Sequence, residues 1–215
     1  MYKRQLFKFA GVDPETGQET FWKDVVDGEG KVTGREKTFN INEATQYEIG
    51  DALPDVTGGF RTSFRWKNFD FMLAAAYQIG GRQWDGNSAN VYSPGRAGFT
   101  ASQDLVGNTW TPEHTNAKFP KLMFNGTWNF VGSNCDYLYR DASYFSLKTI
   151  NVGYTLPKRW TSKICIESLR VFFAADNLYF TSAHTGLDPR TAYAGQNAFG
   201  FPQAKTFTFG ITMNL

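Results

Sequence analysis

Long apolar runs are missing from this sequence. The longest contains residues 72–77 and falls far short of the roughly 18 residues that a membrane-spanning helix needs. Helical insertion is therefore excluded, and any crossing of a membrane must be made by strands. Residues 1–10 also lack the apolar core and cleavage site of a signal peptide. They resemble the middle of a strand, which predicts an export signal upstream and Met1 as the start of a truncated gene.

Motifs for catalysis and metal binding are equally scarce. His114 and His184 are the only histidines, and no His-Glu-x-x-His, Cys-x-x-Cys, Gly-x-Ser-x-Gly or Gly-x-x-x-x-Gly-Lys motif is present. The acidic segments 13–17 and 27–30 lack the spaced oxygen ligands of an EF-hand loop, so both are predicted to be turns. We expect no catalytic residue, no cofactor and no metal site.

An excess of charge is absent too, because the formal net charge is only +2. This balance gives no indication of a nucleic-acid partner. Aromatic residues, in contrast, are abundant at 17%. They dominate the last segment, 205–215, where large apolar side chains alternate strictly with small or polar ones. Such alternation predicts a strand with one apolar face, and its length suits a membrane-spanning strand of a barrel.

Four further segments show the same alternation. With the last segment, the predicted strands are 57–66, 70–80, 144–156, 168–180 and 205–215. Lys67-Asn68 is predicted to be a two-residue hairpin turn, with Asn68 tolerating a positive φ. Elsewhere, Ser102 is predicted to cap a short helix that begins at Gln103.

The connections between these strands alternate between short and long. Lys67-Asn68 and 157–167 are short, whereas 81–142 and 181–203 are long. In outer-membrane barrels the short turns face the periplasm and the long loops face outside. The alternation therefore predicts 11–56, 81–142 and 181–203 as extracellular loops. Aromatic residues near the strand ends fit the aromatic girdles of such barrels: Trp66, Phe69, Tyr154 and Trp160 at the short turns, and Tyr77 and Tyr179 at the outer ends.

Four stretches make the chain resemble a known family, the SusC/RagA-type TonB-dependent transporters of Bacteroidetes outer membranes. These are Ala-Leu-Pro-Asp-Val-Thr-Gly-Gly-Phe at 52–60 with 69–71, Asp-Ala-Ser-Tyr-Phe-Ser-Leu-Lys at 141–148 with 153–157, Leu-Arg-Val at 169–171 with Asp-Asn-Leu at 176–178, and Phe-Pro-Gln at 201–203 with 205–210. Gly-Val-Asp-Pro-Glu-Thr-Gly at 11–17 is a weaker match. Together they span the chain in the order of the family's C-terminal third.

The resemblance implies a plugged barrel of about 22 strands, to which residues 1–215 contribute the C-terminal part of the wall. Here the chain is expected to form an open, curved, all-β antiparallel sheet without the plug and TonB box. The implied function is TonB-dependent import of glycans or peptides through the outer membrane, in contact with its lipids. The implied partners are a SusD-like lipoprotein and, through the missing N-terminal part, the TonB complex. Leu215 ends the chain where such barrels usually end in Phe.

The long loop and the polar strand faces supply the candidate site residues. Six aromatic residues are predicted either to contact a substrate or the lid or to form the loop's own small core: Trp84, Tyr92, Trp110, Trp128, Tyr137 and Tyr139. The lumen-facing charges are predicted to be Arg61, Arg65, Arg170 and Asp176, because a charge facing lipid costs about 2–4 kcal/mol. They either bias the substrate charge or contact the plug and keep the lumen hydrated.

Cys135 and Cys165 are the only cysteines. The predicted topology places Cys135 in an outer loop and Cys165 in a periplasmic turn, about 30 Å apart, which excludes a disulfide. We therefore expect two free thiols.

Two other classes of protein are compatible with parts of the pattern. A soluble, secreted, carbohydrate-binding β-sandwich explains the alternation and the Trp content, but its loops should be short at both ends. An exported glycosidase domain requires two carboxylates about 5 to 10 Å apart, which meet only in the fold.

Overall fold

The computed structural model describes residues 3–92, 100–123, 126–164, 166–191, 196–197 and 200–214. The chain divides into two compact units. We call Pro54–Gly81, Ala142–Thr191 and Phe201–Leu215 the sheet unit. Met1–Leu53, Arg82–Asp141 and Ala192–Gly200 form the loop unit.

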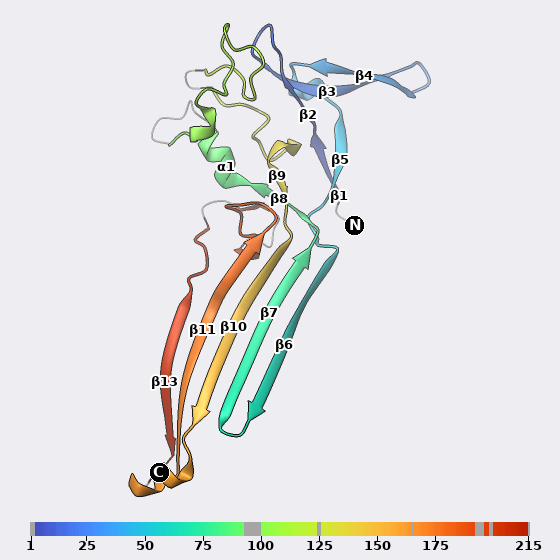
Figure 1. Ribbon diagram of the computed structural model, residues 1–215. Helices are drawn as coiled ribbons and strands as arrows, with labels where there is room; N and C mark the ends of the chain where they lie inside the picture. Colours follow the sequence, from blue (N-terminus) through green and yellow to red (C-terminus); the bar gives the residue numbers. More distant parts are fainter. Residues whose placement is uncertain are drawn as a thin grey trace. The chain divides into compact units, whose positions relative to one another are not determined.

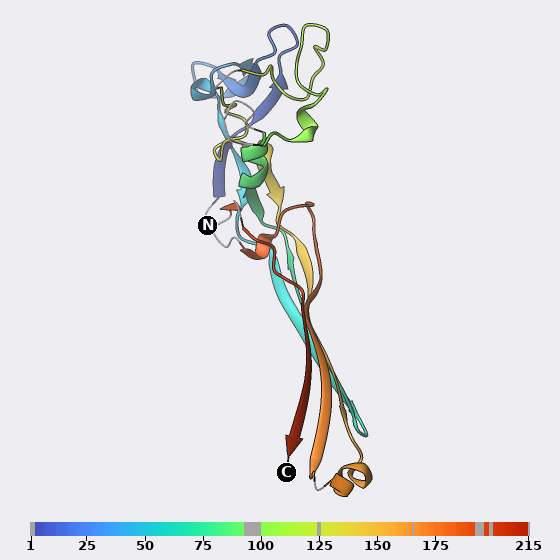
Figure 2. The ribbon, with the colours of Figure 1, turned by 90° about the vertical axis from the view of Figure 1, so that its left-hand side faces the viewer.

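The sheet unit is one antiparallel five-stranded sheet (Figure 1). Its strand order is β13-β11-β10-β7-β6. The strands are β6 (Val56–Trp66), β7 (Phe69–Ile79), β10 (Tyr144–Thr155), β11 (Ser168–Ser182) and β13 (Thr206–Asn214). All five predicted strands are thus confirmed, with ends that differ by at most two residues. Because β6 and β13 are the outermost strands, the sheet is open at both edges, as predicted. Figure 2 shows its twist from the side.

The short connections lie together at one end of this sheet. Asn68 and Thr155 exchange two hydrogen bonds: the Thr155 amide donates to the Asn68 carbonyl at 2.8 Å, and Asn68 Nδ2 donates to the Thr155 carbonyl at 2.7 Å. The predicted hairpin turn is confirmed, but its backbone prediction was wrong, because the positive φ (53°) falls on Lys67. Asn68 instead uses its side chain to join the next strand. Beyond this end, α2 (Lys158–Thr161) and η4 (Ser162–Ile164) lead toward β11.

A bulge interrupts the register between the central strand β10 and both of its neighbours, β11 and β7. Leu147 pairs with Tyr179, but Thr149 already pairs with Asp176. Lys148 of β10 therefore faces two residues of β11, of which Asn177 adopts a left-handed φ of 54°. On the other side, Leu147 and Thr149 pair with the consecutive residues Ala75 and Ala74 of β7, so Lys148 is the extra residue relative to β7. The Asn177 side chain donates to the Ala204 carbonyl at 3.2 Å. The bulge moves the apolar positions of β10 from even numbers, such as Ile150, to odd numbers, such as Leu147.

In the described residues, the loop unit contains three small sheets and short helices. Strands β1 (Lys3–Phe7) and β5 (Gln46–Asp51) form one pair; β2 (Phe9–Val12), β3 (Glu19–Val26) and β4 (Val32–Thr38) form the second sheet; β12 (Gln196–Asn197), β8 (Arg82–Asp85) and β9 (Tyr139–Asp141) form the third. The helices are η1 (Ile41–Glu43), α1 (Gly86–Val91), η2 (Gln103–Leu105) and η3 (Asp136–Leu138), and η5 (Pro189–Thr191) belongs to the sheet unit. Ser102 caps η2 through the Asp104 amide, which confirms that prediction.

Aromatic rings form the core of the loop unit. The Phe9 ring stacks on the Phe130 ring at 4.6 Å, and Trp128 continues the stack at 5.5 Å from Phe130. The Glu19 carboxylate fixes the backbone beside them, because it accepts hydrogen bonds from the amides of Asn129 and Phe130, each at 3.0 Å. A segment with little regular structure is thus held by ring packing and a carboxylate.

Candidate functional site

One face of the sheet unit is apolar from edge to edge. The register places Phe64 opposite Phe71, Phe71 opposite Val152, and Val152 opposite Phe173, which pairs with Phe209. Residues directly opposite each other share a face, so this row crosses all five strands. Three of its five side chains are exposed, Phe209 at 80%, Phe64 at 58% and Phe173 at 37%, and the other two are half-buried. An apolar surface of this extent requires an apolar partner.

Aromatic residues mark both ends of this apolar face. Trp66, Phe69 and Tyr154 form a row at the short connections, and Tyr77 pairs with Phe145 near the other end. Phe69 and Tyr77 lie eight residues apart on β7, about 26 Å along the strand at about 3.3 Å per residue. At a barrel tilt of about 40° this becomes about 20 Å, comparable with the apolar band of about 25 Å in membrane barrels.

The opposite face of the sheet unit is polar, and it holds all four predicted lumen-facing charges. Arg61 pairs with Ala74 and Arg65 with Asp70, while Arg170 and Asp176 pair with Thr212 and Thr206. The register therefore brings the four residues onto one face. Asp176 accepts a hydrogen bond from Thr149 Oγ1 at 2.8 Å, next to the bulge.

A bidentate ion pair connects two strands of the polar face that are not neighbours. Arg170 Nε lies 3.0 Å from Asp70 Oδ1, and Arg170 Nη2 lies 2.5 Å from Asp70 Oδ2. The pair passes over Gly153 of β10, where a Cβ atom would lie 2.6 Å from Asp70 Oδ1. The absence of a side chain at Gly153 therefore allows Arg170 of β11 to contact Asp70 of β7.

A second charged cluster, at the other end of the polar face, was not predicted from the sequence. Arg190 donates to both oxygens of Asp188, at 2.9 and 2.7 Å, and to Ser146 Oγ at 3.0 Å. Its guanidinium lies 4.0 Å from the centre of the Phe180 ring. The connection after β11 thus folds onto the polar face. The Asp-Pro-Arg sequence at 188–190 is the one local signal, but its partners are distant in sequence.

The six predicted aromatic residues all lie in the loop unit and differ in burial. Trp128 and Tyr139 are buried, and the other four are half-buried: Trp84, Tyr92, Trp110 and Tyr137. Their surroundings resemble the small loop core that the sequence allowed. Tyr92 donates to Asp104 Oδ2 at 2.8 Å, and burial followed by this hydrogen bond raises the pKa of Tyr92 to about 12. Trp110 donates to the Pro14 carbonyl at 3.0 Å.

The acidic segments form turns. Asp13 accepts hydrogen bonds from the Thr16 amide at 2.9 Å and the Thr16 hydroxyl at 2.6 Å, and these bonds hold the pKa of Asp13 below its usual value. Asp27 accepts from the amides of Glu29 and Lys31 in the β3–β4 turn. Within the described ranges, no group of three or more His, Cys, Asp or Glu residues is arranged to hold a metal ion.

Two further findings concern membrane spans and cysteines. In the part of the chain that the structure describes, no helix has the length and hydropathy of a membrane span.

Cys135 is a buried free thiol in the loop-unit core. Cys165 lies outside the described residues, so the predicted separation of the two cysteines stays a prediction.

Comparison with known proteins identifies relatives along most of the chain. No protein-family model matches it. TonB-dependent receptor P3 of Formosa agariphila is 30% identical over 212 residues, which cover 94% of this chain and 19% of the receptor. TonB-dependent receptor SusC of Bacteroides thetaiotaomicron is 25% identical over 177 residues, 80% of this chain and 16% of SusC. The chain thus spans about a fifth of the length of the curated relatives it matches.

Solved structures show the same fold. A chain of the RagAB peptide transporter matches with a TM-score of 0.77 at 23% identity, over 98% of this chain and 22% of that one. The RagAB importer in its open-open state matches with a TM-score of 0.76 at 22% identity, over 98% of this chain and 22% of that one. The open amphipathic sheet and these similarities define the class of protein: the chain is part of an outer-membrane β-barrel. Its sequence is similar to TonB-dependent receptors, SusC among them, and its fold to a chain of RagAB, which confirms the predicted SusC/RagA resemblance.

Proposed function

We propose that this chain supplies barrel wall and outer loops to a receptor that imports nutrients across the outer membrane with energy from TonB. The observation that carries the proposal is the open five-stranded sheet, which is apolar on one face and charged on the other. Its edge strands β6 and β13 are free to pair with further strands. A wall of this kind separates lipid from a polar lumen.

The proposed topology follows from the sheet. The short connections face the periplasm, and 11–56, 81–142 and 181–203 face outside, as expected from their lengths. Residues 1–215 then form the C-terminal portion of the barrel. On this assignment Arg61, Arg65, Arg170 and Asp176 face the lumen. Arg170 is held by Asp70, which favours a wall-bracing role for it, whereas Arg61 and Arg65 are exposed to a substrate or a plug.

We also propose that the loop unit meets a SusD-like lipoprotein or the substrate. Support comes from the names of the relatives, since one is SusC and another belongs to a RagAB peptide transporter. Among the six predicted aromatic contacts, the half-buried Trp84, Tyr92, Trp110 and Tyr137 retain surface for such contacts. Trp128 and Tyr139 are buried, so they would support such contacts only indirectly, by packing inside the loop unit. The substrate class is a glycan or a peptide, both of which aromatic surfaces bind.

A growth experiment in the source organism tests this function. The gene is deleted, and growth is measured with oligosaccharides or with oligopeptides as the limiting nutrient. We expect slower growth on one of the two classes, with normal growth on monosaccharides and free amino acids, which pass without this type of import. Restoring the intact gene should restore growth. Unchanged growth on both classes would contradict the proposal.

A further inference from the structure

The end of the sheet unit that carries the short connections is both basic and aromatic. Its connections contain four cations, Lys67, Lys158, Arg159 and Lys163, and one acid, Glu167. Within the described ranges, none of the ion pairs of the structure involves these four cations. All four are exposed. Among the described residues, this end therefore presents positive charge that no ion pair neutralises.

Two of these cations lie above exposed tryptophan rings. Lys67 Nζ is 5.0 Å from the centre of the Trp66 ring, and the Arg159 guanidinium is 5.6 Å from the centre of the Trp160 ring. Trp66 and Trp160 remain 62% and 51% exposed. A cation over a ring keeps a fixed position while its other side stays open to an anion.

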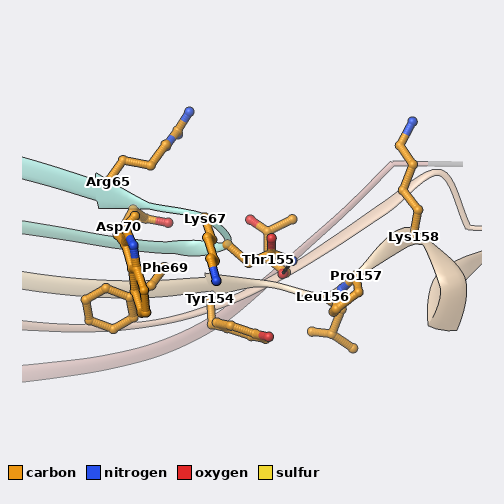
Figure 3. A pocket seen from close by; sticks show the side chains of 11 residues that line it. Arg65, Lys67, Phe69, Asp70, Tyr154, Thr155, Leu156, Pro157 and Lys158 are labelled. Atoms are coloured by element: carbon orange, nitrogen blue, oxygen red, sulfur yellow. Dashed lines mark hydrogen bonds between the residues drawn. The ribbon is translucent and has the colours of Figure 1, made fainter.

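The two faces of the sheet differ in which cations they carry here. Arg65, Lys67, Phe69, Tyr154 and Lys158 line an open hollow of about 710 Å³ at this end. Figure 3 shows Lys67 on the same side of the strands as Phe69 and Tyr154, and Arg65 and Lys158 on the opposite side. Phe69 and Tyr154 belong to the apolar face. Lys67 is thus the cation at the border between that apolar face and water.

Phosphates of a lipid bilayer lie at this same border. Trp and Tyr side chains concentrate at the headgroup level of membranes, and each Lys or Arg near an anionic surface strengthens binding about fivefold. We propose that Lys67 and Arg159 bind the headgroups of anionic phospholipids in the leaflet next to the short connections. The proposal rests on the membrane location of the sheet unit. It adds a lipid class and two binding residues to that location.

Tryptophan fluorescence measures this binding. Trp66 and Trp160 are in the sheet unit, whereas the other four tryptophans, Trp22, Trp84, Trp110 and Trp128, are in the loop unit. The chain is folded in micelles of a zwitterionic detergent, and a small amount of brominated phosphatidylglycerol or brominated phosphatidylcholine is added as the quencher. The Trp66→Phe/Trp160→Phe variant supplies the background from the loop unit. Far-ultraviolet circular dichroism verifies that each variant keeps its strands.

We expect brominated phosphatidylglycerol to quench the sheet-unit signal at a several-fold lower concentration than brominated phosphatidylcholine. Lys67→Gln/Arg159→Gln should abolish the difference. Lys8→Gln/Lys31→Gln removes the same charge from exposed positions of the loop unit and should leave the difference intact. Lys158→Gln, on the opposite side of the sheet, should change the difference between the two lipids by less than about twofold.

Three results would overturn the proposal. The first is equal quenching of the unmodified chain by the two lipids. The second is an equal loss of preference in the loop-unit control, which would mean that net charge alone is responsible. The third is full displacement by inorganic phosphate at the concentration of the lipid, which would identify a site for free anions. A chain that forms no strands in micelles would instead contradict the proposed function as a membrane wall. Failure of the lipid-binding proposal and failure of the proposed function therefore give different results.

Discussion

Gly17 shows how one residue ties a turn to a distant loop. It has a φ of +68°, and a Cβ atom at this position would overlap the Trp110 ring. Gly17→Ala should therefore destabilise the loop unit by about 2–4 kcal/mol, from backbone strain and overpacking together. Urea unfolding followed by Trp fluorescence measures the loss. Gly28→Ala is the matched control, because its Cβ meets nothing within 4 Å; equal stability of the two variants would contradict the packing described.

The Cys135 thiol gives a second prediction at this scale. It is fully buried, and burial raises its pKa to about 12. At pH 8 the folded chain should therefore hold almost no Cys135 thiolate, and the thiol should not react with a disulfide reagent. The measurement uses Cys165→Ser, so that Cys135 is the only thiol, with and without urea. Rapid reaction of the folded chain would show that Cys135 is accessible.

Single residues also mark the limit of prediction from sequence. The aromatic residues of the loop unit were visible, but whether a ring packs inside or outside depends on partners such as Phe9, which is distant in sequence from Phe130 and Tyr137. Arg190 was missed because its partner Ser146 lies 44 residues away. Contacts made in the fold carry no local signature.

At the scale of the strand, alternation predicted the sheet well. A period of two residues is dictated by strand geometry, so the five segments that showed it became β6, β7, β10, β11 and β13. The phase of the alternation was not followed across the bulge at Lys148. Phe145 and Leu147, then Ile150 and Val152, show the shift in the sequence itself. A break in phase inside one strand is the signal that identifies such a bulge.

The ion pair between Arg170 and Asp70 should stabilise the sheet by joining β11 to β7. Both side chains keep some exposure, 31% and 24%, so solvent screening reduces the coupling to about 1–2 kcal/mol. A double-mutant cycle with Asp70→Asn and Arg170→Gln, measured by urea unfolding in micelles, gives this value. Arg65→Gln is the control, because Arg65 is exposed opposite Asp70 and should cost less than about 0.5 kcal/mol. A coupling free energy near zero would contradict this prediction and would mean that the ion pair does not stabilise the sheet.

At the scale of the whole molecule, the sequence predicted the class but not the structure of the loops. The amphipathic sheet, its open edges and the similarity to TonB-dependent receptors follow from alternation and from motifs along the strands. The soluble sandwich, which closes one sheet against a second, does not fit a sheet open at both edges with its apolar face exposed. The relatives are named as receptors and transporters, which favours a role other than catalysis.

The central claim is that the sheet unit needs an apolar solvent on one face. Hydrogen–deuterium exchange of the chain, followed peptide by peptide with and without detergent micelles, tests it most directly. We expect amides of the inner strands β7, β10 and β11 to be protected in micelles and to exchange rapidly in water, with the edge strands β6 and β13 less protected. Equal protection of these five strands in water, in a monomer that melts cooperatively, would contradict the membrane-wall account.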